Sequence, residues 1–225
     1  MNRTTFSPAP ARTDVTAPAP STAPSTGAPA SPADAALART VQRRGYAMAA
    51  GAAIWSASVL TVGSNPTSSV GITISDLAAL PFQLGVMGLL GAMSLTGAIG
   101  TTRTARVMVR VERVLLGLAT LWTVIHGCFP ALRDAGWLAV LDVFWPLSML
   151  GMFVIGIKVA VAGRWRGVAR IWPLVAESWA VVTVPTFVIL GEPFSNWVGG
   201  GHLLVGYTVL GLILARRTAL VLPRR

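Results

Sequence analysis

Residues able to bind a metal or relay a proton lie at the ends of apolar runs in the second half of the chain. His126 closes one run, Asp142 opens the next, and His202 opens the last. Imidazole and carboxylate groups bind Zn²⁺ and other transition metals, and carboxylates inside membranes also form proton relays. No His-x-x-x-His or His-Glu-x-x-His spacing joins them, so whether they meet depends on packing. Glu192 and Asp76 fall in connections at the same level and could lie nearby.

Three further ionisable residues, Glu112, Lys158 and Glu177, lie within apolar runs. An unpaired charge inside a bilayer costs at least ~2.5–3.5 kcal/mol on insertion scales. Pairing Lys158 with Glu177 or Glu112 would remove much of that cost. We therefore predict a structural ion pair within the membrane, with a transport site as the alternative.

Motifs for most enzyme classes are absent from the sequence. It contains no Gly-x-Ser-x-Gly, no His-Glu-x-x-His and no nucleotide-binding motif, and it has only two histidines. A three-histidine zinc site is therefore impossible, although His126 and His202 with Asp142 remain candidate metal ligands. We expect no cofactor. The single cysteine, Cys128, excludes an intramolecular disulfide.

The composition is that of an integral membrane protein. Hydrophobic residues make up 53% of the chain and charged residues 12%, with a mean hydropathy of +0.65. Soluble domains carry about a quarter charged residues. The net charge is +10, but the arginines flank apolar runs and do not form one basic face. We therefore expect the lipid bilayer, and no nucleic acid, as the surroundings of this chain.

Six segments of 15 to 27 residues are predicted to cross the membrane, whose core requires ~20 apolar residues. They are residues 45–63, 76–100, 106–128, 137–163, 171–190 and 201–215. Every basic residue except Arg133 falls on one side of this arrangement. The positive-inside rule then places both termini in the cytoplasm. The predicted fold is an all-α bundle of six transmembrane helices in a bacterial cytoplasmic (inner) membrane.

Two tails flank the predicted transmembrane domain of residues 45–217. Residues 1–44 are rich in Pro, Ala, Ser and Thr and carry almost no large apolar side chains, which predicts a disordered cytoplasmic tail. Residues 218–225 form a short basic cytoplasmic tail. Within the fourth segment, Pro146 predicts a kink because proline lacks the amide hydrogen that a helix requires.

One segment carries a resemblance to a known family. Residues 72–100 read ITISDLAALPFQLGVMGLLGAMSLTGAIG, in which Ile74, Ser75, Asp76 and Leu77 open a glycine-rich second helix. The segment resembles that of small six-helix bacterial integral membrane proteins classed as a domain of unknown function. The histidine-bearing motif of their later helices is not clearly present here. The resemblance implies a six-helix architecture and no chemistry.

These observations lead to three hypotheses of function. The first is small-molecule, ion or proton transport or sensing through a polar site in the outer leaflet around Asp142. The second is a non-catalytic membrane subunit or scaffold, which packs against a partner membrane protein or a second copy through the glycines of residues 76–100. The third is a metal-dependent membrane enzyme.

Overall fold

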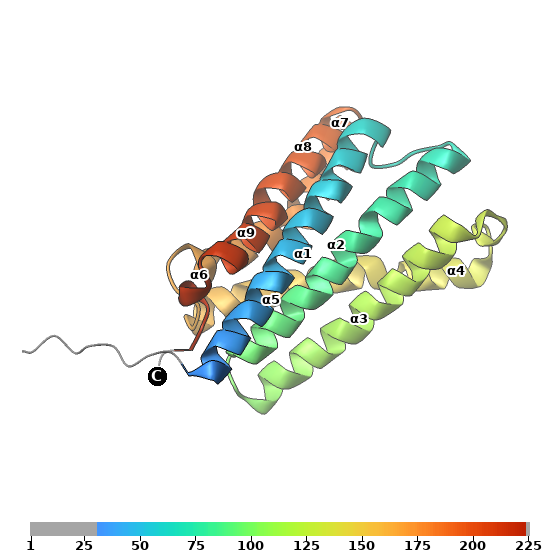
Figure 1. Cartoon of the computed structure of the whole chain (residues 1–225). Helices are drawn as coiled ribbons and strands as arrows, with labels where there is room; N and C mark the ends of the chain where they lie inside the picture. The colour runs from blue at the N-terminus through green and yellow to red at the C-terminus, as the bar shows by residue number, and fades with distance from the viewer. Residues whose placement is uncertain (1–30, 224–225) are drawn as a thin grey trace, which may run out of the picture. The chain divides into compact units, whose positions relative to one another are not determined.

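The computed structural model describes residues 31–223, and every regular element in that range is helical (Figure 1). This confirms the predicted all-α class for the described residues. A π-helical segment, Leu203–Thr208, joins the last two helices, and 3₁₀ turns cover Pro130–Leu132 and Thr218–Leu220. The α-helices are α1 (Pro32–Val62), α2 (Ser69–Thr96), α3 (Arg103–Cys128), α4 (Gly136–Asp142), α5 (Phe144–Ala162), α6 (Val168–Glu177), α7 (Trp179–Leu190), α8 (Phe194–His202) and α9 (Val209–Arg216).

Within residues 31–223, five helical segments are long and apolar enough to cross a membrane. They are α1, α2, α4–α5 (Gly136–Ala162), α6–α7 (Val168–Leu190) and α8–α9 (Phe194–Arg216). The helix α3 has 26 residues and, at 1.5 Å per residue, is about 39 Å long. Its length suits a span, but its first half carries Arg103, Arg106, Arg110, Glu112 and Arg113.

The first helix begins earlier than the sequence analysis predicts, at Pro32, so residues 32–44 of the predicted disordered tail are helical. The side chain of Ser31 accepts a hydrogen bond from the Asp34 amide, and proline occupies the first turn. Both features favour a helix start. The remaining part of the predicted tail, residues 1–30, lies outside the described residues.

Two later helices also begin before their predicted positions of 76 and 201. The second begins at Ser69, because the Ser68 hydroxyl accepts a hydrogen bond from the Gly71 amide at 3.0 Å. The helix α8 begins at Phe194 and includes three successive glycines, Gly199 to Gly201. A Cβ on the first of them would lie 2.9 Å from a methyl of Thr183 on α7, so the missing side chain permits close packing.

The fourth predicted span is interrupted at Val143, between α4 and α5. Pro146 has no amide hydrogen, so it cannot donate to the carbonyl of Asp142, four residues earlier. The interruption therefore falls where proline removes a helical hydrogen bond. It leaves Asp142 at the last position of α4.

Close backbone contacts hold α1 between α2 and α9. A Cβ on Gly85 would lie 2.7 Å from the Cα of Met48, and a Cβ on Gly211 would lie 2.6 Å from an α1 backbone nitrogen. Gly91 lies under the guanidinium of Arg44. Small residues permit helices to approach this closely in lipid. The glycine-rich face of α2 is therefore covered by α1 of the same chain.

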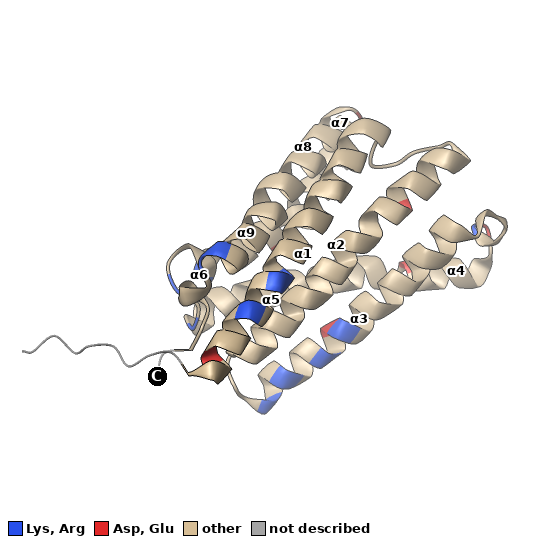
Figure 2. Cartoon of the chain, in the orientation of Figure 1, with Lys and Arg blue, Asp and Glu red and all other residues tan. Residues whose placement is uncertain are grey.

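The two ends of the helix bundle differ in charge (Figure 2). We call one the arginine end: it holds the start of α1, the α2–α3 turn, the α5–α6 loop and the end of α9. We call the other end the acidic end. Among the described residues, Arg133 is its only lysine or arginine. Its acidic residues are Asp76, Asp134, Asp142 and Glu192.

Candidate functional site

A histidine–aspartate pair joins α2 to α3 at the acidic end. The Nδ1 atom of His126 lies 2.7 Å from the Oδ2 atom of Asp76, and the imidazole stacks on Trp122 with a centroid distance of 4.5 Å. Gly127 makes the approach possible, since a Cβ there would lie 2.8 Å from the Cβ of Asp76. Because α2 starts seven residues earlier than predicted, Asp76 lies within the helix and faces α3.

Arg133 fixes the same two helices to each other. Its Nε donates to the His126 carbonyl at 2.9 Å, its Nη1 donates to the Ser69 hydroxyl at 2.9 Å, and its Nη2 donates to the Thr73 hydroxyl at 2.7 Å. The guanidinium thus satisfies groups at the end of α3 and the start of α2. Its hydrogen bonds go to neutral oxygens, and it acts on Asp76 through its charge and not through a hydrogen bond.

Asp76 and Asp142 line a cavity of about 240 Å³, which we call the acidic vestibule. Asp142 is exposed and lies close enough to His126 to interact with it electrostatically. Tryptophans form one wall of the vestibule, with Trp55 between two others. Its ring centroid lies 5.5 Å from that of Trp145 and 5.4 Å from that of Trp179, within the usual range for aromatic pairs. The tryptophans that line the vestibule are Trp55, Trp122, Trp145 and Trp179.

A hydrogen-bonded trio, which we call the polar constriction, closes the inner side of the vestibule. The Thr123 hydroxyl accepts hydrogen bonds from Gln83 Nε2 at 2.7 Å and from Trp145 Nε1 at 3.1 Å. It donates in turn to the Ala119 carbonyl at 3.0 Å. Trp145 lines the vestibule on one side and a cavity of about 20 Å³, the inner cavity, on the other.

Two buried carboxyl groups lie beyond the constriction. Glu112 is 2% exposed and Glu177 is 3% exposed. Each binds a hydroxyl: Ser148 Oγ donates to Glu112 Oε1 at 2.6 Å, and Tyr207 Oη donates to Glu177 Oε2 at 2.6 Å. The two carboxyl groups are close enough to interact electrostatically.

Two oxygens at the inner cavity have no partner among the described residues. Gln83 Oε1 and Glu177 Oε1 are both buried and accept no hydrogen bond there. Both side chains line the inner cavity together with Ser148 and Tyr207. Buried polar atoms are nearly always satisfied in folded proteins. The inner cavity is therefore a place where a small polar species would be held.

Local backbone features place the two glutamates. The carboxylate of Glu112 lies over Gly151 of α5, and a Cβ at that glycine would overlap Glu112 Oε2. Tyr207 lies on the π-helical segment, and π-helical turns are frequent at functional sites. The extra residue of that turn changes the direction of the side chains that follow His202, and Tyr207 faces Glu177 on α6.

Lys158 is the sequence-predicted residue that requires a correction. Its side chain is exposed, and it forms no ion pair within residues 31–223, where the one ion pair joins His126 and Asp76. The predicted partners bind neutral hydroxyls instead. Lys158 follows Gly151, the residue that lies against Glu112, by seven residues, which places it about 10 Å farther along the α5 axis.

Two other predicted site residues do not themselves line the vestibule, although Glu192 contacts Ser64, which does. His202 Nε2 is 2.9 Å from the Val175 carbonyl on α6. Glu192 Oε1 is 3.4 Å from the Ser64 hydroxyl, in the connection after α1. In the described part of the chain, no group of three or more His, Cys, Asp or Glu residues is arranged to hold a metal ion. The structure thus brings His126 and Asp142 together with Asp76, leaves His202 outside the site, and places Glu192 at the rim of the vestibule beside Ser64.

Neither a protein-family model, nor a curated protein, nor a solved structure matches this chain significantly. Its function therefore has to be inferred from the geometry of the site.

Proposed function

We propose that this protein moves protons across a membrane, between the acidic vestibule and the two buried glutamates. The observation that carries the proposal is the pair of buried carboxyl groups, each held by a hydroxyl and neither paired with a basic residue of the 31–223 range. Ionisable residues inside membrane proteins mark proton and ion pathways by default. The polar constriction and the inner cavity lie between the vestibule and Glu177, and Ser148, which also lines the inner cavity, is hydrogen-bonded to Glu112.

The proposed topology has six membrane-spanning helices, with α3 as the sixth and both termini in the cytoplasm of a bacterium. The charge asymmetry between the arginine end and the acidic end supports this orientation under the positive-inside rule. The vestibule then opens to the outside, and Asp142 is the first carboxylate that an entering proton meets. The arginines on the first half of α3 lie at the cytoplasmic interface, where long side chains reach the headgroups.

On its vestibule side, the proposed route has a gap at the inner cavity. Its volume of about 20 Å³ suits a single water molecule, which needs at least about 10–15 Å³ and two to four polar partners. Gln83 Oε1 and Glu177 Oε1 provide two acceptors for it. Burying an ionised carboxylate without a cation is costly, so in this proposal both glutamates hold a proton at rest. Rotation of the Tyr207 and Ser148 hydroxyls would then pass protons between neighbouring oxygens.

Proton flux into liposomes tests the proposal. The full-length protein is reconstituted with a pH-sensitive dye inside, and a potassium diffusion potential drives protons inward. We expect acidification well above that of protein-free liposomes, and Glu177→Gln should reduce it to the protein-free rate. Asp134→Asn is the control, because Asp134 is exposed and lines neither the vestibule nor the inner cavity, and it should keep the full rate. Wild-type protein that acidifies no faster than empty liposomes would contradict the proposal.

The alternative, a non-catalytic subunit, rests on the glycines of α2 as a surface for a partner. That face is covered by α1 of the same chain. The proton pathway is therefore the better-supported proposal.

A further inference from the structure

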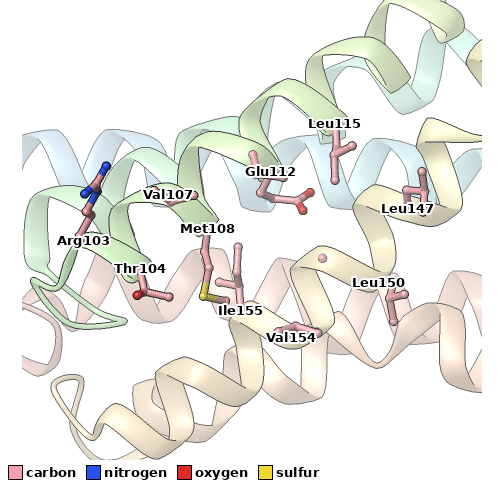
Figure 3. Close-up of a pocket in the computed structure, with 12 residues that line it drawn as sticks. Arg103, Thr104, Val107, Met108, Glu112, Leu115, Leu147, Leu150, Val154 and Ile155 are labelled. Atoms are coloured by element: carbon pink, nitrogen blue, oxygen red, sulfur yellow. The ribbon is translucent and has the colours of Figure 1, made fainter.

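A long groove runs between α3 and α5, apart from the vestibule (Figure 3). Its volume is about 620 Å³, within the range of roughly 300–1,000 Å³ typical of sites for small organic molecules. Its walls are apolar and open on one side, since several of the lining side chains are more than 40% exposed. These are Val107, Val111, Leu147, Leu150 and Val154.

Glu112 is the acidic group of this groove. In Figure 3 its side chain extends from α3 towards α5, where Ser148 and Gly151 lie one turn apart. Oε1 accepts the Ser148 hydrogen bond, and Oε2 lies against Gly151, which also lines the groove. No basic residue pairs with this carboxyl group in the described chain. The other ionisable group of the groove, Arg103, lies nine residues earlier on α3, about 13 Å away along the helix axis.

We infer that the groove binds a lipophilic organic cation, with its apolar body between α3 and α5 and its positive charge at Glu112. The charge of the carboxylate decides between possible occupants. A neutral acyl chain would fill the apolar walls and leave the acid–base chemistry of Glu112 unused, and an anion would be repelled whenever the carboxyl group lost its proton. A cation supplies the charge partner that a buried carboxylate requires. Because the exposed walls face lipid in the proposed topology, the ligand enters from the membrane.

This inference deepens the proposed function, since Glu112 belongs to both. The protonated carboxyl group and the cation give a carboxylate–cation pair and one free proton, which leaves through the inner cavity. Cation binding and proton binding at Glu112 are therefore mutually exclusive, and the chemistry of the site is cation–proton exchange.

Equilibrium binding of radiolabelled tetraphenylphosphonium to the purified full-length protein in detergent tests the inference without any ion gradient. We expect saturable binding, weakened about tenfold or more in Glu112→Gln, as for loss of one partner of a buried charge pair. Glu192→Gln, the same change at a carboxyl group that does not line the groove, should bind as wild type does. Leu150→Trp should also weaken binding, because it fills the groove at a position 60% exposed. Leu84→Trp, at a position 65% exposed that does not line the groove, is its control.

Tetraphenylborate, an anion of the same shape, distinguishes charge-selective binding from non-specific hydrophobic binding. Equal binding of both ions, or undiminished binding of tetraphenylphosphonium to Glu112→Gln, would overturn the inference. Binding without proton flux would leave it standing and remove the proposed function. Proton flux without tetraphenylphosphonium binding would overturn the inference and leave the proposed function standing.

Discussion

At the scale of single residues, the carboxyl groups inside the bundle are stabilised by neutral hydrogen-bond donors. Tyr207 and Ser148 each donate one short hydrogen bond to a glutamate. A hydroxyl is a suitable partner for a carboxyl group that changes its protonation, because it can donate to the ionised form and accept from the neutral one. A lysine partner would instead hold the carboxylate in its ionised form.

Tyr207→Phe is predicted to lower stability through this hydrogen bond. The change removes the donor and leaves Glu177 without its one described partner, which costs roughly 1–3 kcal/mol for a buried polar group. Thermal unfolding in detergent, followed by tryptophan fluorescence, measures the effect. Tyr46→Phe is the control: because Tyr46 is 46% exposed, this variant should unfold at the same temperature as the wild type. Equal midpoints for the two variants would show that the Tyr207 hydroxyl contributes nothing.

Part of this residue-level chemistry could be predicted from the sequence. That His126 and Asp142 lie at the same end of the bundle could be predicted, because both lie at that end of their apolar runs, but whether they meet could not. The lack of an ion pair at Lys158 among the described residues could not be predicted either, since it depends on how each helix is shifted and rotated against its neighbours. Gln83, Thr123 and Tyr207 were overlooked, although a glutamine inside an apolar run is itself a signal of a buried polar contact.

At the scale of elements, glycines decide where helices touch. The sequence predicts a close-packing stripe on α2 but not its partner, which depends on tertiary arrangement. The early start of α1 was predictable in principle from Ser31 and Pro32, a capping pair that the Pro- and Ala-rich surroundings obscure. The break before Pro146 follows from proline chemistry alone.

Two glycine-to-alanine changes should have opposite effects. Gly85→Ala puts a methyl group 2.7 Å from the Cα of Met48, so α1 and α2 must separate and the unfolding midpoint should fall. Gly117→Ala has nothing within 4 Å of the new methyl group, and should raise stability by roughly 0.5–1 kcal/mol through helix propensity. Thermal unfolding of both variants beside wild type checks the prediction. A rise for Gly85→Ala would mean that this contact is not a close one.

At the scale of the whole molecule, the charge difference between the two ends is the basis for the proposed orientation. The apolar content, the helical class and this asymmetry all follow from sequence, because each is a property of composition along the chain. The vestibule and the groove do not, because each requires side chains from helices whose relative rotations only the structure supplies.

The single cysteine provides a direct test of the orientation. Cys128 is exposed at the acidic end. A membrane-impermeant maleimide should therefore label it in intact cells if that end faces outward. A Cys128→Ser variant that also carries Ala219→Cys moves the thiol to an exposed position at the arginine end, and should be labelled only after permeabilisation. The opposite labelling pattern would reverse the topology and place the vestibule in the cytoplasm.

The length of α1 has a consequence for how the protein responds to its bilayer. Its 31 residues extend about 46 Å at 1.5 Å per residue, whereas the hydrocarbon layer is about 30 Å thick. In the proposed topology its first turns project beyond the acyl chains and carry Arg39 and Arg43 into the zone of anionic lipid phosphates. Each such arginine contributes about 1 kcal/mol of attraction near that surface. Lipid charge and bilayer thickness together therefore set the depth at which the protein sits.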